Sequence, residues 1–200
     1  MSPKGRRFQR PLGVRRYRKL FVIAVEGVVT EPQYFALFDD QQSVIHVNCL
    51  KGGHDSSPPQ VLQRMENHLK QAGLKSSDEA WLVVDKDQWT DAQLGTLYTW
   101  AGGHKNYDVA LSNPQFEYWL LLHFEDGTGI ASALDCTNRL KRHLPGYNKG
   151  IDVRKINREQ IDEAIRRARQ RDTPPCVDWP RALGGTTVYK LVENILRTGL

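Results

Sequence analysis

Four short apolar segments, each followed by residues that favour a helix, constrain the fold of this chain most strongly. The segments are KLFVIAVEG (19–27), SVIHVNCL (43–50), AWLVVDKD (80–87) and YDVALSN (107–113). They are short and rich in β-branched residues, which is typical of strands buried on both faces of a sheet. Strands that alternate with helices over short loops predict an α/β fold with a mostly parallel central sheet of about four strands flanked by helices.

The helices between these strands are predicted from their start signals. Thr30 is expected to cap the first helix, because a proline and a glutamine follow it at favourable positions. SPPQ (57–60) predicts a second helix start, and Asn113 is expected to cap the helix in PQFEYWLLLHF, with Pro114 at its first position. Other helices are predicted over 91–101, 131–144, 157–170 and 186–196.

Charge divides the chain into a tail and a folded body. Residues 1–20 contain eight Lys or Arg and no acid, whereas the other 180 residues contain 20 basic and 23 acidic side chains, a balance of −3. Residues 1–17 have no apolar periodicity and are predicted to be disordered. Residues 18–200 are predicted to form a single domain, with a helical C-terminal part from about residue 130.

Composition argues for a cytoplasmic protein. The three cysteines are widely spaced and form no CxxC pair, which argues against a disulfide framework or a zinc ribbon and suits a reducing compartment. No apolar segment approaches the roughly 20 residues of a membrane span, so no membrane partner is expected. The basic N-terminus lacks the apolar core of a secretory signal.

Acidic residues lie where the predicted strands end. Glu26 ends the first strand, and Asp85 and Asp87 end the third, where an extended chain would project both aspartates to the same side. Open α/β sheets bind ligands at the carboxyl ends of their strands. Carboxylate oxygens suit Mg²⁺ or Mn²⁺, which can activate a water against a phosphodiester. We therefore predict Glu26, Asp85 and Asp87 as metal ligands. The alternative is turn chemistry, with Asp87 as a helix cap.

Glu26 has a second predicted role, and three further residues are candidates for the site. Glu26 is also predicted to be a general acid/base, because neighbouring acids and burial would raise its pKa. Glu117 is predicted to be catalytic, since a charged residue in so apolar a helix needs a partner. His123 is a third catalytic candidate, and the alternative is a core histidine with satisfied hydrogen bonds. Glu31 is expected to interact with its helix dipole, with a supporting role in the site as the alternative.

Basic residues predict contacts with nucleic acid. The tail has the electrostatic character of a phosphate binder, and the segment 138–171 contains eleven Lys or Arg against four acids. Lys51 lies in KGGHDSS, a loop that either cradles a phosphate or has no such role. The predicted contacts are Arg6, Arg7, Arg15, Arg16, Lys51, Lys149, Arg154, Lys155, Arg166 and Arg167.

The blocks LFVIAVEGVVTEPQYF, WLVVDKD and LSNPQFEYWLLLHF resemble, in order and spacing, the signature blocks of the RloB-like family, which is similar to the Toprim fold. YNKG (147–150) and the last helix resemble the family more weakly. The resemblance places the Toprim glutamate at Glu26 and the Toprim DxD at Asp85 and Asp87. It also implies a bacterial restriction or anti-phage locus with an ATPase partner. Val28 and Val29 stand where the family favours a charged residue.

These observations predict a Mg²⁺- or Mn²⁺-dependent nuclease that hydrolyses RNA, including tRNA, or DNA. One alternative is a nucleic-acid-binding or sensor subunit that works through an ATPase without cutting. Another is an interaction module with a degenerate acidic site. The oligomeric state, including a homo-oligomer, is left open by the sequence.

Overall fold

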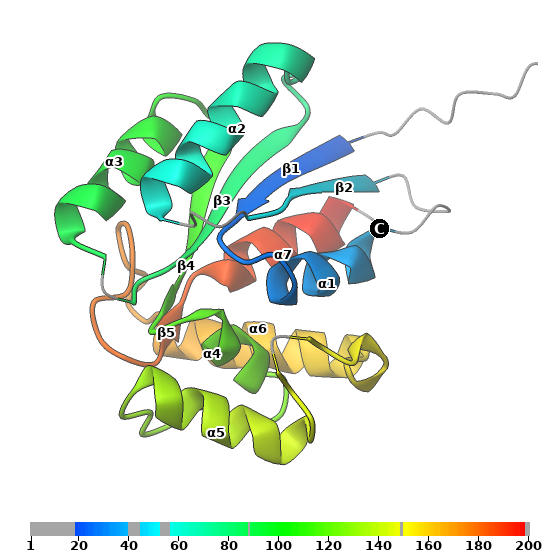
Figure 1. Cartoon of the computed structure of the whole chain (residues 1–200), viewed down its shortest axis with the longest axis vertical. Helices are drawn as coiled ribbons and strands as arrows, with labels where there is room; N and C mark the ends of the chain where they lie inside the picture. Colours follow the sequence, from blue (N-terminus) through cyan, green and yellow to red (C-terminus); the bar gives the residue numbers. More distant parts are fainter. Residues whose placement is uncertain (1–18, 40–44, 53–56, 88, 149, 199–200) are drawn as a thin grey trace, which may run out of the picture.

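The computed structural model describes residues 19–39, 45–52, 57–87, 89–148 and 150–198. Within these residues the chain forms a five-stranded sheet with helices on both faces (Figure 1). The strand order is β2-β1-β3-β4-β5, in which the first four strands are parallel and β5 is antiparallel to β4. The strands are β1 (Lys19–Val25), β2 (Ile45–Leu50), β3 (Glu79–Asp85), β4 (Tyr107–Asn113) and β5 (Gly185–Thr186).

The predicted α/β class is confirmed, and the arrangement is consistent with a Toprim-like sheet. β5 was not predicted, because two residues are too few to carry a periodic apolar pattern. Its place depends on pairing with β4, where Ser112 lies opposite Thr186 and the two hydroxyl oxygens are 2.9 Å apart.

The helices form two layers that bury different faces of the sheet (Figure 1). One core contains apolar residues of α2 and α3 beneath the side chains of Val22, Leu82 and Val84. The other core contains residues of α1 and α4–α7 against Phe21, Ile23 and Val83. The helices are α1 (Thr30–Phe35), α2 (Pro58–Ala72), α3 (Asp91–Gly102), α4 (Phe116–Leu121), α5 (Ala133–His143), α6 (Arg158–Arg171) and α7 (Val188–Thr198), with 3₁₀ turns η1 (Ala36–Phe38) and η2 (Val153–Lys155).

Two of the predicted helix caps are wrong. Thr30 lies inside α1, whose N-cap position is Val29, and the hydroxyl of Thr30 lies 3.3 Å from that of Tyr147. Asn113 ends β4, and its amide donates to the carbonyls of Pro180 and Arg181, each at 3.1 Å. In both cases a distant segment supplies a partner for the polar side chain, which the local cap pattern cannot reveal.

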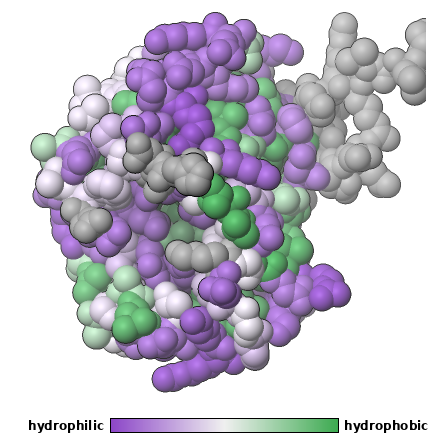
Figure 2. All heavy atoms as spheres, in the orientation of Figure 1, coloured by the Kyte–Doolittle hydropathy of each residue, from purple (hydrophilic) through white to green (hydrophobic). Residues whose placement is uncertain are grey.

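On the face shown in Figure 2, most side chains are hydrophilic, and the apolar ones gather in small separate patches. The large apolar residues most exposed among those described are Val28, Leu134, Val177 and Leu183. Among the described residues, no helix combines the length and the apolar character needed to cross a bilayer. The predicted disordered tail, residues 1–17, lies outside the described residues.

Candidate functional site

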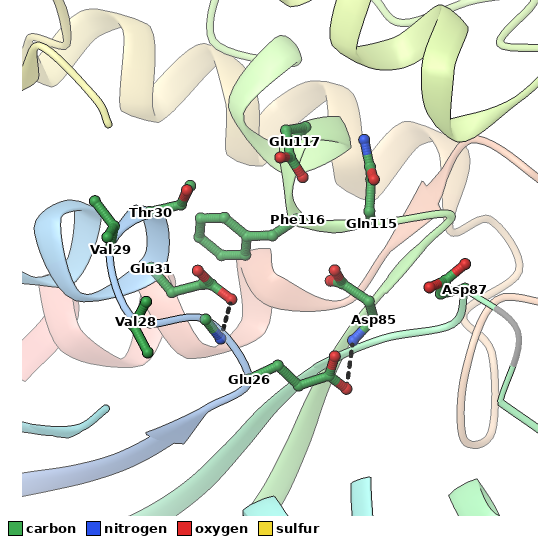
Figure 3. Close-up of a pocket in the computed structure, with 11 residues that line it drawn as sticks. Glu26, Val28, Val29, Thr30, Glu31, Asp85, Asp87, Gln115, Phe116 and Glu117 are labelled. Atoms are coloured by element: carbon green, nitrogen blue, oxygen red, sulfur yellow. Dashed lines mark hydrogen bonds between the residues drawn. The ribbon is translucent and has the colours of Figure 1, made fainter. Parts of the chain in front are cut away.

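A pocket of about 440 Å³ opens beside the carboxyl ends of β1 and β3 (Figure 3). The two strands are parallel neighbours in which Val25 pairs with Val83, so the residues that follow them lie side by side. Four predicted site residues therefore meet in one pocket, together with Glu31. The lining residues are Glu26, Gly27, Val28, Val29, Thr30, Glu31, Asp85, Asp87, Gln115, Phe116 and Glu117.

Glu26 has the electrostatic character expected of a proton-transfer group. Burial, followed by the charges of Glu31 and Asp87, raises the pKa of Glu26 to about 8. Hydrogen bonds from the backbone of Asp85 and the side chain of Trp89 oppose this rise by stabilising the carboxylate. The bond from the Asp85 amide to Glu26 Oε1 is long, at 3.4 Å, but it lowers the pKa of Glu26 more than the bond from Trp89 does.

Asp85 ends β3 at the floor of the pocket. Its pKa is raised well above the usual range, first by burial and then by the charges of Glu26, Glu31 and Glu117. A backbone hydrogen bond from Phe116 opposes that rise. Within the described part of the chain, neither Glu26 nor Asp85 forms an ion pair with Lys, Arg or His. Their carboxylates therefore repel one another in a partly desolvated space.

Asp87 lines the same pocket, but the prediction that it projects from an extended strand beside Asp85 is wrong. β3 ends at Asp85, and Asp87 has a φ of 29° in the turn that follows, so the two aspartates do not project from one extended strand. The amide of Asp87 donates to the Pro114 carbonyl at 3.0 Å, which fixes this turn against the segment after β4. The helix-cap alternative is also wrong, because Thr90 caps α3 in a reciprocal pair with Gln93.

Glu31 contributes to the pocket more directly than its position in a first helical turn suggested. Glu31 is 6% exposed, and its Oε1 accepts a hydrogen bond from the Gly27 amide at 2.9 Å (Figure 3). A Cβ at Gly27 would lie 2.1 Å from Glu31 Oε2, so a side chain here would displace the Glu31 carboxylate from its present position. The glycine therefore allows the chain after β1 to pass close to a carboxylate of α1.

Glu117 lines the pocket from the start of α4 (Figure 3). It is 5% exposed, and the hydroxyl of Tyr147 donates to its Oε1 at 2.8 Å. Sequence patterns predict no role for Tyr147, although YNKG (147–150) is a weaker part of the family resemblance. A local pattern could not have linked two residues 30 positions apart.

His123 lies in the core and does not line the pocket, so its predicted catalytic contact is not supported. It is 2% exposed, and its Nδ1 lies 3.0 Å from the Trp119 carbonyl oxygen. Its Nε2 lies 3.2 Å from the hydroxyl of Tyr34. Burial lowers the pKa of His123 to about 4, which keeps the ring neutral. The sequence alternative, a core histidine with satisfied hydrogen bonds, describes it correctly.

The predicted nucleic-acid contacts lie in varied surroundings. Arg154 is exposed and donates to Asp152 at 2.8 Å, and Arg166 is exposed and donates to Glu163 at 2.8 Å. Arg167 is half-buried and donates to the Leu122 carbonyl at 2.7 Å, so it also has a structural role. The contacts themselves stay predictions. Lys51 and Lys155 are exposed, whereas Arg6, Arg7, Arg15, Arg16 and Lys149 lie outside the described residues.

The pocket has the donor chemistry of a hard-cation site without a preformed metal triad. Mg²⁺ and Mn²⁺ prefer oxygen ligands, and five carboxylates line this pocket. Across the described residues, however, no three His, Cys, Asp or Glu side chains are already arranged to hold an ion. The residue types fit a divalent cation, but the carboxylates would have to rotate to converge on one.

The family model described as RloB-like protein matches residues 21–195. The chain belongs to the RloB-like protein family. The matched range contains all five carboxylates of the pocket and extends through most of α7, so the C-terminal helices belong to the family domain as much as the sheet does. No curated protein and no solved structure matches the chain.

Proposed function

We propose that this RloB-like protein is a divalent-metal-dependent nuclease that hydrolyses phosphodiester bonds of RNA or DNA. The observation that carries the proposal is the pocket at the strand ends, in which Glu26 and Asp85 lie beside three other carboxylates. Carboxylates with raised pKa values in a concave site are the usual marks of a catalytic centre. The family resemblance further suggests a bacterial anti-phage or restriction system, the cytoplasm as its location, and an ATPase partner.

Glu26, Asp85 and Asp87 are the residues that would hold the Mg²⁺ or Mn²⁺ ion, with Glu31 and Glu117 beside them. When bound, such an ion polarises a phosphodiester and lowers the pKa of a coordinated water. The pocket residues supply the proton chemistry. In the metal-free pocket, a pKa near 8 keeps Glu26 protonated at neutral pH, so with Asp85 and Asp87 holding the ion Glu26 suits donation of that proton to a leaving oxygen. As a ligand of the ion, Glu26 would first have to lose the proton.

A cleavage assay tests the proposal. Purified protein is incubated with labelled single-stranded and duplex RNA and DNA, with Mg²⁺, with Mn²⁺ or with EDTA, and with or without the proposed ATPase partner. Cleavage that needs the metal and disappears in Glu26→Gln supports the nuclease. Absence of cleavage with every substrate, both metals and the ATPase would refute it.

A non-catalytic nucleic-acid-binding or sensor subunit is the second candidate. It is favoured by the lack of a preformed three-ligand metal site among the described residues. This alternative predicts tight binding of nucleic acid with no cleavage, and binding that is unchanged by EDTA. Glu26→Gln would then alter stability but not the response of the ATPase partner.

A further inference from the structure

A segment that follows α5 connects the C-terminal helices to the pocket with the five carboxylates, which we call the acidic pocket. Tyr147 in this segment is 5% exposed, and its hydroxyl donates to Glu117 Oε1 at 2.8 Å. Thr30, which lines the pocket from α1, has its hydroxyl 3.3 Å from the same phenol oxygen. One buried tyrosine therefore contacts side chains from two walls of the pocket.

The direction of these hydrogen bonds follows from proton counting. A phenol has a single proton, and the proton of Tyr147 is donated to the carboxylate of Glu117. The Thr30 hydroxyl must then be the donor in its contact with Tyr147. Donation polarises the phenol and strengthens its bond to the carboxylate.

The surrounding backbone fixes the position of this tyrosine. The Tyr147 amide donates to the Leu144 carbonyl at 3.0 Å, at the end of α5. The Ile151 amide donates to Gln33 Oε1 of α1 at 2.7 Å, and the Ile151 side chain is buried. The ring of Tyr147 packs in the core shared by α1 and α4–α7. Hydrogen bonds at Tyr147 itself and four residues after it therefore fix the backbone that positions its hydroxyl.

We propose that Glu117 is a further ligand of the cation in this pocket, and that Tyr147 is a positioning residue that orients the Glu117 carboxylate toward that cation. Tyr147 does not itself line the pocket, so it acts through Glu117 and not on the substrate. The inference rests on the proposed nuclease function, and it gives the segment after α5 a part in the site. Groups that hydrogen-bond a metal ligand from outside commonly set its orientation and the affinity for the ion.

The molecule contains a matched control for this bond. Tyr189 of α7 is also 5% exposed, and its hydroxyl donates to Asp172 Oδ2 at 2.8 Å. Neither Tyr189 nor Asp172 lines the pocket. Tyr147→Phe and Tyr189→Phe therefore remove the same kind of buried phenol–carboxylate bond, one at the site and one away from it. A purely structural role would give the two variants similar behaviour.

The experiment compares these two variants with the wild type by Mn²⁺ titration without substrate and by cleavage kinetics. We expect Tyr147→Phe to weaken Mn²⁺ binding about tenfold and Tyr189→Phe to leave it within about twofold. With Mn²⁺ near the wild-type dissociation constant, Tyr147→Phe lowers kcat and leaves KM for the nucleic acid unchanged, and excess Mn²⁺ restores kcat. In a Glu117→Gln background, Tyr147→Phe has little further effect.

The inference is overturned if Tyr147→Phe binds Mn²⁺ and cleaves like the wild type, if excess Mn²⁺ does not restore its rate, or if Tyr189→Phe loses as much. It can fail separately from the proposed function. If the wild type cleaves nothing, the nuclease proposal fails, and the Mn²⁺ titration alone then decides the role of Tyr147. Equal melting temperatures of the two variants confirm that their structural losses are matched.

Discussion

Glutamates of the acidic pocket and of α6 lie in opposite electrostatic surroundings. In the pocket, burial and the charges of Glu31 and Asp87 raise the pKa of Glu26 to about 8. On α6, Glu163 lies 2.8 Å from a guanidinium nitrogen of Arg166, and this hydrogen bond holds the pKa of Glu163 below its usual range. A glutamate side chain is therefore more easily protonated in the pocket and more easily ionised on α6.

This difference in pKa distinguishes exposed ion pairs, which have little functional consequence, from buried carboxylates, which are suited to catalysis. Exposed pairs such as Arg166–Glu163 are solvated and contribute little to stability. Clustered carboxylates such as Glu26 and Asp85 cost stability, because their charges are desolvated and repel each other. Such a cost is commonly retained where a bound ligand compensates for it, which is why the pocket and not α6 carries the functional proposal.

The largest expected effect is on catalysis at Asp85. Asp85→Asn removes one charge from the cluster and keeps the shape of the side chain, so we expect kcat to fall by roughly 100-fold or more. The matched change on α6, Glu163→Gln, should leave kcat within about twofold. Kinetics with the substrate identified in the cleavage assay check both. Equal activity of Asp85→Asn and wild type would remove Asp85 from the proposed site.

Stability as a function of pH gives the next largest effect. A carboxyl with a raised pKa in the folded state binds more protons there than in the unfolded chain, so stability falls as pH rises from about 5 to about 8. In EDTA, we expect Glu26→Gln to reduce this loss by about 2 kcal/mol, since Glu26 is only partly desolvated. Urea unfolding at several pH values measures it. A wild-type protein that becomes more stable over this range would contradict the raised pKa values.

Two neighbouring arginines of α6 test whether an exposed ion pair contributes less to stability than a half-buried hydrogen bond. Arg167 is half-buried and donates to the Leu122 carbonyl, so Arg167→Ala should destabilise the protein by about 1–2 kcal/mol. Arg166 pairs with Glu163 on the exposed face, so Arg166→Ala should change stability by no more than about 0.5 kcal/mol. Thermal unfolding of both variants checks the difference, and equal losses would show that position within α6 does not matter.

The smallest expected effect concerns binding of nucleic acid. Arg154 and Lys155 are exposed, and a phosphate can compete with the weak surface pair that Arg154 forms with Asp152. The double change Arg154→Ala/Lys155→Ala should reduce affinity a few-fold and lower the salt dependence by about one unit per lost phosphate contact. Lys105→Ala, an exposed lysine before β4, is the control. Fluorescence anisotropy at several salt concentrations measures the affinity and its salt dependence, and so shows whether these side chains contact the nucleic acid.

Much of the candidate site was accessible from the sequence because it follows strand ends. Glu26 and Asp85 come directly after apolar runs, and neighbouring parallel strands must bring such residues to one edge. Glu117 was predicted because a charge in an apolar helix needs a partner, and the structure gives it Tyr147. The identity of that partner was not predictable, since proton donors from a remote segment leave no local periodicity.

Local sequence patterns are enough to predict the four parallel strands, the helices between them and the acids at the strand ends. These features depend on local apolar patterning, which is set within a few residues. Tertiary structure alone decided that Asp87 leaves the strand, that His123 is a core residue, and that Thr30 contacts Tyr147 instead of capping a helix. Each of those outcomes involves a hydrogen bond to a group distant in the sequence, and only the folded chain brings such groups together.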